Sequence, residues 1–231
     1  GEVVVPQIVG HRLEMPEPLA GSRVQGEQAV AKQVVAGAIR ARLEDRFGLL
    51  IDGSSDAAQR QQTLRAAIDW SYELLSPDQQ AFFARLGVFA GTFDLDAALA
   101  VAGTCLDAPV DLLASLVKQS MVARAGRDRY RLLDTLRAYA LEALAQLDAD
   151  ETRNHHAAFY MAVAEQGEIA IRGADQRGWL EHLRRDINNF RAALDWCLLT
   201  GDTTSAGRLA GALAWFWTLN GMLAEAIQHL E

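Results

Sequence analysis

Apolar residues recur three and four positions apart along most of the chain, which is the spacing that places them on one face of an α-helix. The pattern predicts an amphipathic helix over residues 34–47 and a second helix over residues 64–75. It is absent from residues 1–33, where prolines and glycines interrupt any helical period. We therefore expect a linker or an extended segment over residues 1–33.

Capping motifs predict three helices in the next part of the chain. The motif Ser76-Pro77-Asp78-Gln79 combines an N-cap serine, a proline at the first helical position and a glutamine at the capping-box position, so a helix is expected to begin there. Asp94 can cap a second helix that ends at Gly103. Asp107 can cap a third helix that runs to about Gln119.

A β-hairpin is predicted directly after these helices. Two short runs, residues 121–124 and 129–133, flank the polar, glycine-containing turn at residues 125–128. Three helices followed by a hairpin is the order of elements in a winged helix, so we expect that fold here.

After Asp134 the pattern predicts helices alone. One helix is expected over the stripe at residues 136–144, another is expected to begin near Asp150, and a clean helical face extends from Trp179 to Cys197. A helical hairpin array is suggested by an echo of two glycine and alanine pairs, Gly201 with Ala206 and Gly221 with Ala226. The expected fold class is therefore mainly α, a winged helix followed by a helical array.

Composition and charge limit the classes of function. The 231 residues are 50% hydrophobic and 23% charged, which is typical of a folded globular chain. A formal net charge of −8 argues against a chain-wide phosphate-binding surface, so nucleic-acid binding would have to be local. Two cysteines make no disulfide framework, and no apolar run approaches the roughly 20 residues of a membrane helix. We expect a cytoplasmic protein with no membrane contact.

No motif for catalysis, metal binding or nucleotide binding is present. The chain lacks the G-x-x-x-x-G-K-[ST] and G-x-S-x-G patterns, so we assign no catalytic residue and no cofactor and do not expect an enzyme. His155 and His156 are adjacent and point about 100° apart on a helix, which favours a polar helix surface over a metal site. The run Trp215-Phe216-Trp217 could stack on bases, but its leucine neighbours favour core packing.

Four arginines in the predicted hairpin are candidates for contacts with DNA backbone phosphates: Arg124, Arg127, Arg129 and Arg131. In helix-turn-helix proteins the recognition helix carries polar and basic side chains near its start. Here the corresponding helix, residues 109–118, has an acid early, Asp111, and a base late, Lys118. This pattern favours packing against protein over the recognition of DNA bases.

The segment QQTLRAAIDWSYELLSPDQQAFFARLGVFA, with FDLDAALAVAG, DLLASLVKQSMV and RYRLLDTLRAYALEAL after it, closely resembles the bacterial STAND-type transcriptional regulators of the AfsR-like and LuxR types. The resemblance extends from about Ala36 to Glu231. It implies that residues 34–149 form the helical subdomain and winged helix of an NB-ARC module. Residues 150–231 would then begin a TPR-like helical sensor domain.

The resemblance also implies a nucleotide-sensing position. Relatives carry a Met-His-Asp motif just after the wing, and the matching residues here are Leu132, Leu133 and Asp134. Leucine cannot donate a hydrogen bond to a phosphate as the histidine does. Asp134 remains able to cap the next helix or to order the hinge. ADP or ATP would be bound by the full-length parent protein and not by this chain.

On this basis we expect a regulatory hinge and sensor segment of a nucleotide-dependent signal-transduction ATPase that controls transcription. The expected partners are the preceding nucleotide-binding domain of the same protein, a protein or small-molecule effector on the TPR-like helices, and a further copy through self-association. DNA would be bound through a separate output domain. Two alternatives stay open: a winged-helix DNA-binding protein with a helical dimerisation tail, and a TPR-like protein-interaction scaffold.

Overall fold

The structure, a computed structural model, describes residues 55–104 and 106–222. The predicted linker at 1–33, the predicted helix at 34–47, Cys105 and Ala226 lie outside the described residues. Contacts divide the chain into two compact units, Gly1–Ala67 and Ile68–Glu231. The paragraphs below concern the second unit, apart from the part of the first helix that precedes Ile68. The predicted domain boundary near residue 150 lies inside this unit and stays a prediction.

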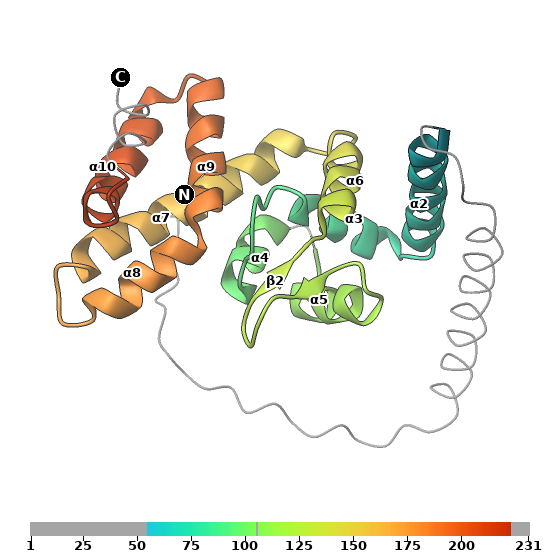
Figure 1. Ribbon diagram of the computed structural model, residues 1–231, viewed down its shortest axis with the longest axis horizontal. Helices are drawn as coiled ribbons and strands as arrows, with labels where there is room; N and C mark the ends of the chain where they lie inside the picture. Colours follow the sequence, from blue (N-terminus) through green and yellow to red (C-terminus); the bar gives the residue numbers. More distant parts are fainter. Residues whose placement is uncertain (1–54, 105, 223–231) are drawn as a thin grey trace, which may run out of the picture. The chain divides into compact units, whose positions relative to one another are not determined.

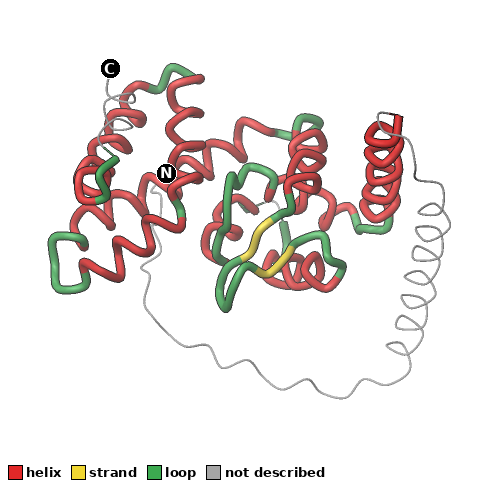
Figure 2. The backbone as a smooth tube through the Cα atoms, in the orientation of Figure 1, coloured by secondary structure: helices red, strands yellow, loops and turns green. Residues whose placement is uncertain are grey.

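The described elements are helices joined to one small hairpin (Figures 1 and 2). The first group consists of α2 (Ser55–Glu73), α3 (Pro77–Leu86), α4 (Leu95–Ala102), α5 (Pro109–Lys118), β1 (Ala123–Arg124), β2 (Tyr130–Arg131) and α6 (Asp134–Leu144). The second group consists of α7 (Ala149–Ala170), α8 (Gln176–Arg185), α9 (Ile187–Leu199) and α10 (Thr203–Leu219). Helices α3 to α5 and the hairpin form the predicted winged helix, so the predicted fold class is confirmed.

Two of the predicted helix starts are confirmed. At α3 the Ser76 amide donates to Gln79 Oε1 at 2.9 Å and the Gln79 amide donates to Ser76 Oγ at 3.3 Å, which completes a capping box. At α4 the Asp94 carboxylate accepts from the Ala97 amide at 2.9 Å. Gly103 ends α4 with a φ of 67°, a conformation that favours glycine.

Another predicted start is wrong and a further one is confirmed. Asp107 does not cap α5, because Pro109 occupies the first helical position and so puts Ala108, in a left-handed conformation, at the N-cap. Helix α7 begins at Ala149, next to the predicted position near Asp150, and Asp148 caps it by accepting from the Glu151 amide at 3.0 Å.

The wing is shorter than the predicted strands. Ala123 pairs with Arg131 and Arg124 with Tyr130, and the Ala125 amide donates to the Arg129 carbonyl at 2.8 Å to close the turn. Phe93 adds a third extended segment, because its amide and carbonyl both bond to Tyr130. The hairpin is thereby tied to the loop that precedes α4.

The predicted continuous helical face from Trp179 to Cys197 is broken at Asp186. The structure has two helices, α8 and α9, and the chain changes direction between them (Figure 1). Asp186 itself has φ −99° and ψ 6°, outside the helical region. The apolar spacing carries on across the break, since Leu183 and Phe190 are both buried, so periodicity alone could not locate it.

One apolar core extends from α3 to α10. Helix α3 packs closely on α6, where a Cβ placed on Gly87 would lie 2.9 Å from the Cβ of Ala140. Helix α7 packs against α4, α9 and α10. Phe216 and Trp217 are core residues as predicted, whereas Trp215 is 43% exposed. No helix among the described residues is both long and apolar enough to span a membrane.

Candidate functional site

The exposed face of α5 carries few groups suited to base recognition. Val110, Asp111, Ala114 and Lys118 are exposed, while Leu113 and Leu116 face the core. The acid lies in the first turn and the base is the last residue of the helix. The side chains near the start of α5 are therefore apolar or acidic, as the sequence indicated, and offer no donor to the base edges of DNA.

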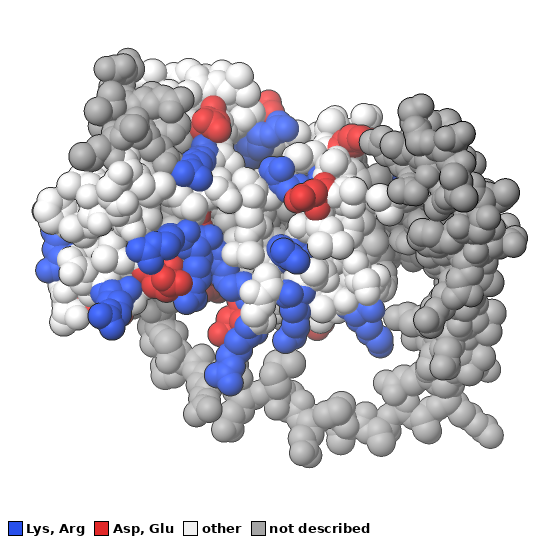
Figure 3. Space-filling view, viewed as in Figure 1, with Lys and Arg blue, Asp and Glu red and all other residues white. Residues whose placement is uncertain are grey.

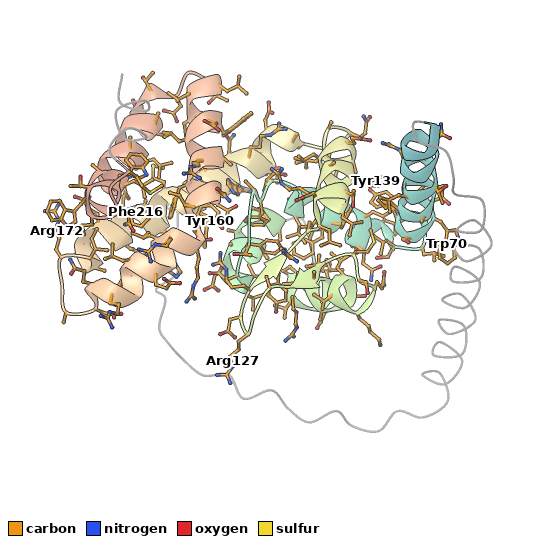
Figure 4. All side chains as sticks on the ribbon, in the orientation of Figure 1. Trp70, Arg127, Tyr139, Tyr160, Arg172 and Phe216 are labelled. Atoms are coloured by element: carbon orange, nitrogen blue, oxygen red, sulfur yellow. The ribbon has the colours of Figure 1, made fainter. Side chains whose placement is uncertain are left out.

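Three of the four predicted wing arginines are exposed. Arg124, Arg127 and Arg131 form no ion pair within the described part of the chain, and Arg124 lies over the Tyr130 ring at 6.0 Å. Arg127 projects outward from the tip of the hairpin (Figure 4). Basic side chains are spread over the face seen in Figure 3, with acidic side chains among them. These three arginines are positioned to meet phosphates, which Lys and Arg bind in backbone contacts with DNA.

Arg129, the fourth predicted phosphate contact, is instead a structural residue. Its guanidinium forms an ion pair with Asp186, with Nη1 donating to Oδ2 at 3.1 Å. Nη2 also donates to the Thr92 carbonyl at 2.7 Å, and Nη1 lies 3.5 Å from the Asp94 carboxylate. Only 11% of the side chain is exposed. The prediction of a phosphate contact at Arg129 is wrong, because protein groups already occupy its donors.

Burial and charge act together at this ion pair. Burial disfavours the charge on Arg129, but the hydrogen bond and charge of Asp186 outweigh it and raise the pKa of Arg129 above its ordinary value. Burial also raises the pKa of Asp94, although the Ala97 amide and the charge of Arg129 oppose the change. The arginine is therefore held as a cation between two carboxylates.

Asn189 and Tyr160 complete this polar cluster. Asn189 Oδ1 accepts from the Ala90 amide at 2.9 Å, and its Nδ2 donates to the Thr92 carbonyl at 2.8 Å. The Tyr160 hydroxyl donates to Asp186 Oδ1 at 3.4 Å. We call Arg129, Asp186, Asn189 and Tyr160 the junction, because they connect the winged helix to α7, α8 and α9.

The sequence analysis did not identify the junction. A polar pair of residues inside an apolar helical stripe was the available signal: Asp186 interrupts the stripe, and Asn189 lies one turn later. The partners of both residues lie about 57 to 99 positions earlier in the chain, so helical periodicity could not reveal them.

The three residues at the predicted nucleotide-sensing position have different environments. Leu132 is buried, Leu133 is 48% exposed and Asp134 is exposed. Asp134 does not cap α6, because Leu133 occupies the N-cap position and Asp134 is the first residue of the helix. The predicted cap is therefore wrong, and a role in nucleotide sensing stays a prediction.

His156 lies in the core and not on the polar helix surface that the sequence suggested. Its pKa is lowered to about 3, chiefly by burial and in part by the charge of Arg137, while a hydrogen bond with Asn189 opposes both effects. The imidazole is therefore neutral. Within the described ranges, no three His, Cys, Asp or Glu side chains are arranged to hold a metal ion.

Comparison with known proteins supports the winged helix. Residues 75–145 match the winged helix-turn-helix domain family. The chain is homologous to mycobacterial proteins named "Putative HTH-type transcriptional regulator". It is 41% identical over 191 residues to the Mycobacterium tuberculosis protein Rv0890c and to the Mycobacterium bovis protein Mb0914c, covering 80% of this chain and 22% of each relative.

A second relative is shorter. The M. tuberculosis protein named "Uncharacterized protein Rv0894" is 42% identical over 115 residues, which cover 47% of this chain and 29% of the relative. The chain thus spans about a fifth of the length of the regulators and less than a third of this protein. No solved structure matches the chain at a significant level.

Proposed function

We propose that the chain is the winged-helix segment of a transcriptional regulator and that its wing contacts the phosphate backbone of DNA. The observation that carries the proposal is the set of exposed arginines on the hairpin, Arg124, Arg127 and Arg131. The similarity to proteins named HTH-type transcriptional regulators supports it at least as well as it supports a hinge without DNA contact. Because α5 offers few base-reading side chains, the binding is expected to be weakly sequence-dependent.

Fluorescence anisotropy with a labelled random-sequence duplex tests this function. We expect a Kd of the order of 10 μM at low salt, with log K falling linearly as log[salt] rises. The double variant Arg127→Gln/Arg131→Gln removes two exposed wing cations. It should weaken binding at least tenfold and reduce the salt slope by about 2.

A matched control removes the same charge elsewhere. Arg172→Gln/Arg208→Gln deletes two exposed arginines of α7–α10 that pair on the surface with Glu168 and Glu165. This variant should bind DNA within about twofold of the parent chain, because its cations do not belong to the hairpin and pair with carboxylates of α7. Equal losses in the two variants, or no binding at low salt, would exclude a DNA contact through the wing.

A second function is favoured by the junction. We infer that the chain also acts as a hinge between a nucleotide-binding module and a TPR-like sensor in the parent protein, with ADP or ATP bound by that module. Arg129 and Asn189 connect the winged helix to α7–α9, and a connection of this kind is what coupling between two sites requires. A conformational change caused by an effector bound to the helices would then be transmitted to the winged helix.

The exposed Leu133 provides the test of the hinge. In the parent protein, Leu133→His places an imidazole donor at the position that the STAND resemblance assigns to phosphate sensing. ADP binding should tighten at least fivefold, measured by equilibrium dialysis with labelled ADP, while Leu147→His, at another exposed leucine, should leave it unchanged. Identical ADP affinity in the two variants would contradict the proposed sensing position.

A further inference from the structure

A groove of about 260 Å³ lies between the winged helix and the helices that follow it. Its walls come from the segment just after α3 and from α6, α7 and α9. The lining residues include Val88, Arg137, Leu141, Arg153, His156, Asp195 and Trp196. The volume is just below the range of roughly 300–1,000 Å³ that is typical of small-molecule sites, so it fits a ligand of about one ring.

A buried polar atom in the groove lacks a partner. His156 is 3% exposed, and its Nε2 atom has no hydrogen-bond partner among the described residues. Leaving a buried polar atom unpaired costs about 1–3 kcal/mol, and native proteins rarely tolerate it without a reason. A ligand group that hydrogen-bonds to Nε2 would remove this cost.

The charged groups of the groove favour an anion. Arg137 is fixed by its Nε, which donates to the Phe89 carbonyl at 2.6 Å, and its two Nη atoms have no hydrogen-bond partner in the part of the chain that the structure describes. The Arg153 guanidinium lies over the Trp196 ring at 5.0 Å. Asp195 is exposed and carries an opposing charge, and Asp150, which does not line the groove, lies 3.5 Å from Arg153 Nη1. Among the residues that line the groove, two cations therefore stand against one carboxylate, beside the apolar side chains of Val88 and Leu141.

We propose that this groove binds a small organic anion with an apolar ring, its acidic group held by Arg137 and Arg153 and hydrogen-bonded to His156 Nε2. Arg137 belongs to α6, which lies within the residues 75–145 that match the winged helix-turn-helix family, and Arg153 belongs to α7. A bound anion therefore contacts both the winged helix and the helical segment after it. The test of this site is independent of DNA and nucleotide binding, because the binding of the anion is measured on this chain alone.

Benzoate is the probe, titrated against the chain while the Trp196 indole N–H is followed by two-dimensional NMR. Trp196 lines the groove, and in the free protein its N–H donates to Asn154 Oδ1 at 2.9 Å. The signal of this N–H therefore responds to a ligand in the groove. We expect saturable shifts with a Kd of the order of 1 mM, as befits a ligand of this size. Benzyl alcohol, which lacks the charge, and benzamidine, which reverses it, should each bind at least tenfold more weakly.

Two variants and a matched control make the test specific. Arg153→Gln should weaken benzoate binding at least fivefold, and Asp195→Asn should strengthen it at least twofold. Arg172→Gln is the control, since Arg172 lies over the Trp215 ring at 5.9 Å in the same way but outside the groove. It should leave the Kd unchanged.

Three results would overturn the proposal. They are the absence of saturable shifts at Trp196, equal binding of benzoate and benzyl alcohol, and equal effects of Arg153→Gln and Arg172→Gln. His156→Leu, which removes Nε2 from a buried site, should also weaken benzoate binding in protein that keeps its native NMR spectrum. Unchanged affinity there would exclude the contribution of the imidazole.

Discussion

Arg129 in the turn of the hairpin and Asp186 between α8 and α9 form an ion pair across 57 positions of sequence. The Asp186 carboxylate is 3% exposed and also accepts from Tyr160. A carboxylate this deeply buried needs its cation, because the low dielectric of the interior penalises an unpaired charge. The pair therefore ties the geometry of the wing to the direction of the helices that follow.

Removing one partner of the pair should destabilise the fold strongly. Arg129→Gln leaves Asp186 buried without its cation, and we expect the free energy of unfolding to fall by about 3 kcal/mol or more. Urea denaturation followed by circular dichroism measures the change. Arg127→Gln, two positions earlier on the exposed tip, is the control and should change stability by less than about 0.5 kcal/mol. Similar losses in the two variants would show that the ion pair contributes little.

Two adjacent asparagines offer a second test of the junction. Asn189→Ala deprives the Ala90 amide and the Thr92 carbonyl of their partner, so we expect a loss of about 3 kcal/mol in the free energy of unfolding. Asn188 is exposed, and Asn188→Ala should cost less than about 0.5 kcal/mol. The same urea titration compares the two. A small loss of stability in Asn189→Ala would mean that water binds the Ala90 amide and the Thr92 carbonyl as well as the asparagine does.

Local sequence predicted the elements whose partners are close in the chain. The capping box at Ser76 and the cap at Asp94 depend on residues three positions away, and both are confirmed. The winged-helix order could be predicted for the same reason, since it follows from capping and turn residues along one short segment. The four wing arginines were identified from the predicted hairpin, and three of them are exposed.

Residues with distant partners could not be assigned in this way. Arg129 looked like its three neighbours, and only the fold brings Asp186 beside it. His156 looked like a surface residue beside His155, but the rings of Phe89 and Tyr160 enclose it at 5.4 and 4.7 Å. Periodicity records which face of a helix is apolar, whereas the pairing of buried polar groups depends on tertiary contacts.

Two glycines distinguish close packing from helix propensity. Gly87→Ala places a Cβ 2.9 Å from the Cβ of Ala140 and 3.0 Å from the Leu141 amide nitrogen. The backbone there is right-handed, so crowding between α3 and α6 is the cost, and we expect a loss of about 1–3 kcal/mol.

Gly207→Ala is the matched control for Gly87. It lies in α10 with no atom within 4 Å of the new Cβ, and should gain up to about 1 kcal/mol because alanine favours a helix over glycine. Thermal unfolding of both variants measures the sign directly. A loss of stability in both variants would indicate that helix propensity at Gly207 and crowding at Gly87 are not the deciding effects.

The buried His156 should make the fold sensitive to acid. Its pKa is about 3 in the folded chain and near 6.5 when exposed, so between these values the unfolded chain binds the extra proton. The stability that the neutral imidazole contributes is complete above about pH 6.5. It is lost as the pH falls, at up to about 1.4 kcal/mol per pH unit between about pH 6 and 4.

His156→Leu removes the titrating group and should flatten that slope by close to one proton, measured by urea titrations at several pH values. Burial also raises the pKa of Asp94, but this carboxyl group is present in the parent and the variant and cancels in the difference. Phe159→Leu, an apolar change on the same helix, should keep the slope of the parent even where it lowers stability. If His156→Leu retains the full slope, the acid sensitivity arises from the carboxylates and the imidazole is not the responsible group.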